Sequence, residues 1–134
     1  MLLKLRAGEK LYLNGAVITV DRKVTIELLN DATFLLEAHV IQPQQANTPL
    51  RQLYFVLQMQ LMEREGAPLA RQMFRTMLDS TCEAFGSSGV VEGLRLAGAL
   101  VESNKLFEAL RTIRGLFPLE AGIMTGASPE TAAA

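Results

Sequence analysis

The first third of the chain alternates apolar and polar residues with a period close to two. The alternation is clearest in the segments 3–5, 11–13 and 24–28, and it is typical of strands that bury one face. Asn14-Gly15 separates two apolar runs and favours a tight hairpin, because both residues tolerate positive φ. Further turns are predicted at Gly8-Glu9, Asp21-Arg22-Lys23 and Asn30-Asp31.

This pattern predicts five or six short strands. Their connections are short, so we expect them to be antiparallel, in a meander or small barrel. The expected strands cover about residues 2–6, 10–13, 16–20, 23–29, 32–37 and 39–41.

The period then changes to that of a helix. Thr48 is a suitable N-cap and Pro49 suits a first turn, and Leu50, Leu53, Leu57 and Leu61 follow at helical spacing. A second helix is predicted from Pro68, a third over about 90–102, and a fourth capped by Asn104, with Gly115 and Pro118 around its end.

We therefore predict an α+β protein with a β-rich unit followed by a bundle of about four helices. The expected division is residues 1–46 for the β unit, 47–120 for the bundle and 121–134 for a disordered tail rich in Gly, Ala, Ser, Thr and Pro.

Composition supports one folded domain. The chain has 134 residues, of which 49% are hydrophobic and 20% charged, with a net charge of −1. The chain lacks the strongly basic net charge that would indicate nucleic-acid binding. Residues 1–51 nevertheless contain six basic and five acidic side chains, a net of +1, whereas the remainder contains seven basic and nine acidic, a net of −2.

The chain shows no signal for an oxidising or membrane environment. It has a single cysteine, Cys82, so no internal disulfide is possible. It has no apolar run of roughly 18 residues and no signal-peptide pattern at its amino terminus. We expect a cytoplasmic protein that does not associate with a membrane.

Little in the sequence indicates catalysis, a cofactor or a metal. His39 is the only histidine and has no nearby cysteine for a zinc site. It forms a nucleophile–base pair with Cys82 only if the fold brings the two together. A small buried hydrophobe is the favoured interpretation of Cys82, and a surface or structural role that of His39. We expect a non-enzyme.

The remaining candidate is a cationic surface on the β unit. Lys4 and Arg6 share one face of the first strand, and Tyr12 is expected to point outward on the neighbouring strand. Such a face holds single-stranded RNA when phosphates meet the cations and bases stack on the ring, although an ordinary solvated face fits the same residues. The candidate RNA-binding residues are Lys4, Arg6, Lys10, Tyr12, Arg22, Lys23 and Arg51.

The chain resembles the FlbT family of bacterial flagellum-biosynthesis repressors over about residues 2–120. The resemblance rests on Leu5-Arg6-Ala7-Gly8-Glu9, Leu13-Asn14-Gly15-Ala16-Val17, Val20-Asp21-Arg22-Lys23-Val24, Ile26-Glu27-Leu28-Leu29-Asn30-Asp31, Phe34-Leu35-Leu36-Glu37, Thr48-Pro49-Leu50-Arg51-Gln52-Leu53-Tyr54-Phe55 and Phe107-Glu108-Ala109-Leu110. It implies a post-transcriptional repressor that binds the 5′ untranslated leader of flagellin mRNA, lowers translation and promotes decay of the message, in opposition to the FlaF regulator. It implies no catalytic residues.

Leu5-Arg6-Ala7-Gly8-Glu9 is also similar to an early strand and turn of the carbon storage regulator family. That second resemblance, over about 35 residues, implies a role for Arg6 in RNA contact. It also implies a homodimer or higher homo-oligomer formed through the β unit.

A second function stays open from the residues themselves. The methionines at positions 59, 62, 73 and 77 lie at helical spacing and serve either as core filler or as an adaptable groove for a partner helix. The alternative is therefore an interaction adaptor that binds flagellin or a flagellar chaperone and affects translation indirectly.

Overall fold

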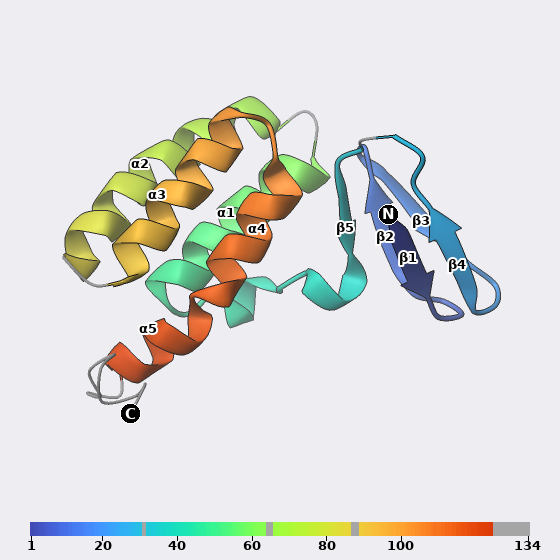
Figure 1. Cartoon of the computed structure of the whole chain (residues 1–134), viewed down its shortest axis with the longest axis horizontal. Helices are drawn as coiled ribbons and strands as arrows, with labels where there is room; N and C mark the ends of the chain where they lie inside the picture. The colour runs from blue at the N-terminus through green and yellow to red at the C-terminus, as the bar shows by residue number, and fades with distance from the viewer. Residues whose placement is uncertain (31, 64–65, 87–88, 125–134) are drawn as a thin grey trace.

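The computed structural model describes residues 1–30, 32–63, 66–86 and 89–124. A five-stranded β unit lies beside a helical bundle, and the two are joined by β5 and two short 3₁₀ helices (Figure 1). The α+β prediction is confirmed. The elements are β1 (Leu2–Leu5), β2 (Lys10–Leu13), β3 (Ala16–Thr19), β4 (Val24–Glu27), β5 (Phe34–Leu36), η1 (Glu37–His39), η2 (Pro43–Gln45), α1 (Pro49–Met62), α2 (Ala67–Phe85), α3 (Gly89–Glu102), α4 (Leu106–Gly115) and α5 (Phe117–Met124).

The strands form two antiparallel sheets rather than one meander or a closed barrel. β1 pairs with β4, and β2 lies between β3 and β5. The inner faces of the two sheets meet in a small core built on Leu3, Leu5, Leu11 and Phe34. β1 and β2 are consecutive in sequence, yet they belong to different sheets because their apolar faces pack against each other.

Local turn chemistry agrees with the prediction where the hairpin is tight. Asn14 and Gly15 both have positive φ, 49° and 84°, between β2 and β3, as a type I′ turn requires. The prediction of a sixth strand at 39–41 was wrong. His39 ends a 3₁₀ helix there, and Val40 and Ile41 pack against the helical core without strand pairing.

α1 is the centre of the bundle. Leu50, Leu53, Tyr54 and Leu57 are all fully buried, and the helix contacts α2, α4 and α5. Its start is the one predicted, since Thr48 caps it by accepting a hydrogen bond from the Arg51 backbone N–H at 3.2 Å.

Two details near the end of the bundle differ from the prediction. Asn104 does not cap α4: it lies in the left-handed region with φ of 60°, and the N-cap is Lys105, with no side-chain cap bond. Gly115 ends α4 and Pro118 lies just beyond it, as predicted, but the chain then forms a further helix, α5, with Pro118 in its first turn, where its missing N–H has no cost. Residues 121–124 are therefore helical rather than part of a disordered tail, and 125–134 lie outside the described residues.

β5 joins the two halves through strand alternation. Leu35 belongs to the helical core, while its neighbour Phe34 belongs to the β core. Phe34 also stacks on Phe107 of α4 with ring centroids 4.4 Å apart. This contact sets the position of the β unit against the bundle, and with it the position of the surface described next.

Candidate nucleic-acid interface

The outer face of the β1–β4 ladder carries cations opposite the apolar core. Along β1, Leu3 and Leu5 are buried and Lys4 is exposed, as strand alternation requires. Leu5 lies opposite Val24, so Arg6 and Lys23 extend from the two strands at the same end of the ladder. Lys4 is exposed on β1, Arg6 is exposed directly after it, and Lys23 lies at the same end.

Two turns are tied together at this end of the β unit. Gly8, with φ of 79°, donates its backbone N–H to the carbonyl oxygen of Val20 at 2.8 Å. The Arg6 backbone N–H donates to Glu9 Oε1 at 3.2 Å, and the Glu9 N–H returns a bond to the Arg6 carbonyl at 3.0 Å. The β1–β2 turn is thereby fixed against the start of the β3–β4 turn, which carries Arg22 and Lys23.

Lys10 begins β2 directly after the fixed turn and is exposed. Its backbone N–H donates to Glu37 Oε2 at 2.9 Å, so this carboxylate oxygen bonds to the backbone of Lys10 and not to its ammonium group. The structure therefore gathers five basic side chains at one end of the β unit, which we call the cationic end: Lys4, Arg6, Lys10, Arg22 and Lys23.

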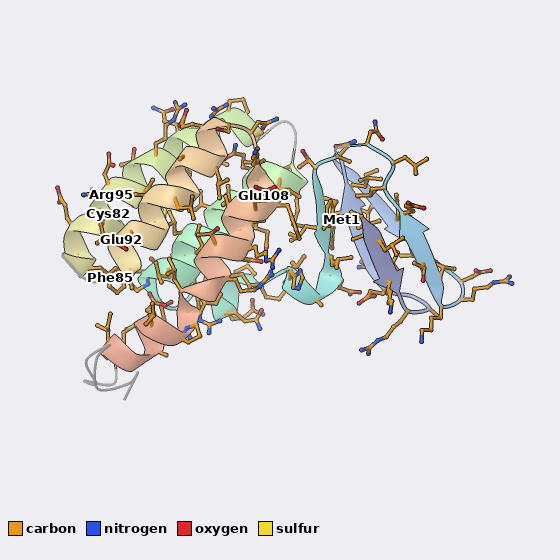
Figure 2. All side chains as sticks on the ribbon, viewed as in Figure 1. Met1, Cys82, Phe85, Glu92, Arg95 and Glu108 are labelled. Atoms are coloured by element: carbon orange, nitrogen blue, oxygen red, sulfur yellow. The ribbon has the colours of Figure 1, made fainter. Side chains whose placement is uncertain are left out.

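The cationic end keeps a positive balance. Among the described residues, its carboxylates are Glu9, Asp21 and Glu37, so five cations against three anions leave a net charge of +2. The Arg22–Asp21 pair is 3.2 Å long, with side chains 78% and 80% exposed. A pair that exposed contributes little stability and is readily exchanged for another anion. Figure 2 shows long, nitrogen-tipped side chains extending into solvent at this end of the unit.

Tyr12 is not part of the cationic end. It lies on β2, which does not pair with β1, and its side chain packs against the helical core opposite Leu35. The prediction that Tyr12 faces outward beside Lys4 and Arg6 was wrong, because β2 is covered on both faces, by the β1–β4 ladder on one and by helices on the other.

Arg51 also lies elsewhere. Its guanidinium sits 4.6 Å above the ring of Phe117 in α5, a cation–π contact within the helical half. Phe117 in turn packs edge-on against Tyr54, with ring centroids 5.5 Å apart.

A polar junction that the sequence did not reveal surrounds Tyr54. Its hydroxyl donates to the His39 carbonyl oxygen at 2.6 Å and accepts from Arg114 Nη1 at 3.3 Å. Burial raises the pKa of Tyr54, so the phenol keeps the proton it donates. Burial, and then the charge of Arg114, lower the pKa of His39. No local sequence feature around Arg114 indicates a contact with Tyr54 or His39, so only the tertiary fold identifies this junction.

His39 and Cys82 do not form a catalytic pair. Cys82 lies near the carboxyl end of α2, at the side of the bundle remote from η1 (Figures 1 and 2). Burial raises the pKa of the Cys82 thiol, which disfavours the nucleophilic thiolate. Cys82 is partly buried and packs against the helical core.

The described part of the chain offers neither a metal-binding group of side chains nor a membrane-spanning helix. Residues 1–30, 32–63, 66–86 and 89–124 contain no group of three or more His, Cys, Asp or Glu placed to hold a metal ion. Among the same residues, no helix has the length and apolar character needed to cross a membrane.

The fold and this surface define a small α+β protein whose exposed chemistry is a cationic sheet end. A family model described as "Flagellar protein FlbT" matches residues 1–124, and the chain belongs to the FlbT family. Three curated proteins named "Probable flagellum biosynthesis repressor protein FlbT" are each 50% identical to it. The Chelativorans sp. (strain BNC1) protein aligns over 92% of this chain and 85% of its own length, and the proteins of Brucella anthropi and Brucella ovis align over 95% of this chain and 84% and 83% of theirs. No solved structure matches the chain.

Proposed function

We propose that the protein is a post-transcriptional repressor in flagellum biosynthesis. In this proposal it binds the 5′ untranslated leader of flagellin mRNA in the cytoplasm, lowers translation and promotes decay of the message. The repressor role is supported by the names of relatives that are 50% identical over most of both chains. The RNA-binding part is supported by one observation, the gathering of five cations at one end of a β unit in a chain whose net charge is −1.

The proposed contact is mainly electrostatic. Lys4, Arg6, Lys10, Arg22 and Lys23 would meet phosphates, with the arginine forks also able to bind base edges. No exposed aromatic ring has been found among the described residues of the cationic end, so stacking on Tyr12 is not part of the mechanism. Occupying the leader would block ribosome loading and leave the message open to nucleases.

The site is tested by removing charge there and, separately, elsewhere. Arg6→Ala with Arg22→Ala should weaken binding to a flagellin leader RNA about tenfold at near-physiological salt, because two phosphate contacts are lost. The logarithmic salt slope should also become shallower by about 1.4, at roughly 0.7 per phosphate on a single strand.

The matched control is Arg95→Ala with Lys105→Ala. Both side chains are exposed on the helical half, so this variant removes the same charge from a different surface. Binding that falls equally in the two double variants would show a general charge effect and remove the cationic end as the site.

A second candidate function is an adaptor that binds flagellin or a flagellar chaperone, or a FlaF-type regulator, and acts on translation indirectly. It is favoured by apolar side chains exposed on the helices: Met59 at 38%, Leu69 at 63% and Met73 at 45%. Pure protein that ignores the leader RNA but co-elutes with flagellin would support the adaptor. We also propose a homodimer or higher homo-oligomer, which light scattering of the pure protein tests.

A further inference from the structure

A second polar surface lies at the opposite end of β2 from the cationic end. It is a cleft of about 830 Å³ between the β2–β3 turn, the end of α1, the start of α2 and the α3–α4 connection. Asn14 and Gly15 form its β side, and Asn104 lies on its helical side. The cleft is therefore separate from the proposed RNA contact, and the inference below does not depend on RNA binding.

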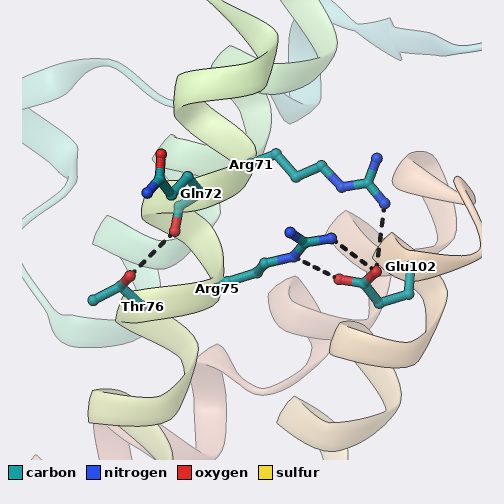
Figure 3. A network of polar contacts seen from close by, with 5 residues as sticks. All are labelled: Arg71, Gln72, Arg75, Thr76 and Glu102. Atoms are coloured by element: carbon teal, nitrogen blue, oxygen red, sulfur yellow. Dashed lines mark hydrogen bonds and ion pairs between the residues drawn. The ribbon is translucent and has the colours of Figure 1, made fainter.

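Two arginines on successive turns of α2 line this cleft and share one carboxylate. Arg75 holds Glu102 with both its Nε and Nη2, at 2.8 and 3.0 Å, whereas Arg71 reaches it only through Nη2 at 3.4 Å (Figure 3). The group has two positive charges and one negative charge. Arg71 is the weakly held member, and its Nε is a buried donor with no hydrogen-bond partner among the described residues.

A buried acceptor in the same cleft also lacks a partner. Gln60 is only 8% exposed, and its Oε1 makes no hydrogen bond to any described residue. A buried polar atom without a partner destabilises a fold by about 1–3 kcal/mol, so each such atom calls for an explanation, and a bound group that completes the bonding is one. Gln60 lies on α1 and Arg71 on α2, so the unpartnered acceptor and donor come from two helices that meet at the cleft.

These groups together specify the chemistry of an occupant. Arg71 requires an anion with an accepting oxygen, and Gln60 Oε1 requires an N–H or O–H donor. A bare carboxylate satisfies only the first, and phosphate, although its O–H can donate, has no aliphatic part to lie against Leu61, Pro68 and Leu106. An acidic residue within a peptide satisfies both, with its side-chain carboxylate on Arg71 and a backbone N–H on Gln60.

The apolar part of the lining separates a peptide from a nucleotide. Leu61, Pro68 and Leu106 contribute aliphatic surface to the cleft, and no aromatic ring is among its lining residues in the described chain. Bases are usually held by stacking on aromatic rings, which the described lining does not offer. We propose that this cleft binds an acidic segment of a protein partner, with a Glu or Asp side chain on Arg71.

The test uses the full chain and a capped glutamate, N-acetyl-glutamate methylamide, as probe. The expected result is a saturable NMR shift of the Arg71 Nε–H and the Gln60 side-chain amide. Capped glutamine, inorganic phosphate and uridine monophosphate are the comparison ligands. Each should bind at least about tenfold more weakly than capped glutamate. Capped glutamine lacks the negative charge for Arg71, and phosphate and uridine monophosphate lack a short aliphatic chain that fits the cleft.

Two variants check that the response comes from these groups. Arg71→Gln and Gln60→Leu should each weaken the binding of capped glutamate about tenfold. The affinity is measured from the backbone NMR signals of Asn14 and Thr33. Gln60→Leu should fold at least as stably as the natural chain, because it removes an unpartnered buried oxygen. Arg6→Ala with Arg22→Ala should leave this binding within about twofold, since the cationic end is at the other end of β2.

Several outcomes overturn the proposal. One is no saturable shift with capped glutamate. Phosphate or uridine monophosphate binding as tightly as capped glutamate would assign the cleft to an anion or a nucleotide. Shifts of the same signals with protein concentration alone would assign it to a second copy of the chain. Loss of RNA binding in the cationic-end variant does not bear on these results, so failure of the two proposals is distinguishable.

Discussion

Glu120, in the first turn of α5, should be among the most important polar side chains for the stability of the bundle. It is 1% exposed, and its Oε2 accepts the backbone N–H of Leu50 at 2.7 Å across 70 residues of sequence. Pro49 has no N–H to satisfy, and Thr48 takes the N–H of Arg51. Glu120 thus completes the hydrogen bonding of the first turn of α1, where a negative charge is also favoured by the helix dipole.

The size of the effect follows from what each substitution leaves behind. Glu120→Ala removes a charge-assisted hydrogen bond worth about 1.5–3 kcal/mol and opens a gap, so the free energy of unfolding should fall by about 3 kcal/mol. Glu120→Leu fills the space but leaves the Leu50 N–H buried without an acceptor, and should cost about 1–3 kcal/mol. Glu120→Gln keeps an acceptor but loses the charge, and should cost about 1 kcal/mol.

The assay is urea unfolding followed by circular dichroism at neutral pH. Glu108→Ala is the matched control, because Glu108 is exposed on α4, and it should change stability by less than about 0.5 kcal/mol. Glu120→Ala that costs no more than Glu108→Ala would refute this account of how α5 holds the start of α1.

Further predictions concern single positions in the fold. Tyr12→Ala should lower the free energy of unfolding by about 2 kcal/mol, because a half-buried ring is lost, and should leave RNA affinity within about twofold after correction for unfolded protein. Unchanged stability with a large loss of RNA affinity would restore Tyr12 as a stacking residue. A Cβ on Gly93 would lie 2.7–3.1 Å from three atoms of the Leu116 side chain, whereas one on Gly98 would meet a single methyl group, so Gly93→Ala should unfold at lower urea than Gly98→Ala. Burial lowers the pKa of His39, so the imidazole binds a proton more readily in the unfolded chain than in the folded one. The free energy of unfolding should therefore fall as the pH drops below about 6.5. His39→Gln should flatten that decline, and an unchanged pH profile would exclude His39 as its source.

Local sequence rules predicted the β2–β3 turn and the start of α1, since each depends on a few adjacent residues. Asn14-Gly15 supplies positive φ and Thr48-Pro49 supplies a cap, and no tertiary contact is needed to recognise either. Strand pairing was harder. β1 pairs with β4 across two intervening strands, and periodicity states which face is apolar but not which strand lies beside it.

The candidate site shows the same division. Alternation along β1 placed Lys4 on the surface correctly. Tyr12 was misplaced because the face of β2 that the alternation marks as outward is the face that packs on the helices. Gln60 and Arg71 have no sequence signal at all, because their unpartnered atoms are brought together only by the packing of α1 against α2.

The central proposal is direct recognition of a flagellin leader. Its most direct test is fluorescence-anisotropy binding of the purified chain to that leader and to a scrambled RNA of equal length, at near-physiological ionic strength. Preferential binding to the leader, weakened by Arg6→Ala with Arg22→Ala, is the predicted result. Equal binding to both RNAs, or none, would contradict it and move the function to a protein partner.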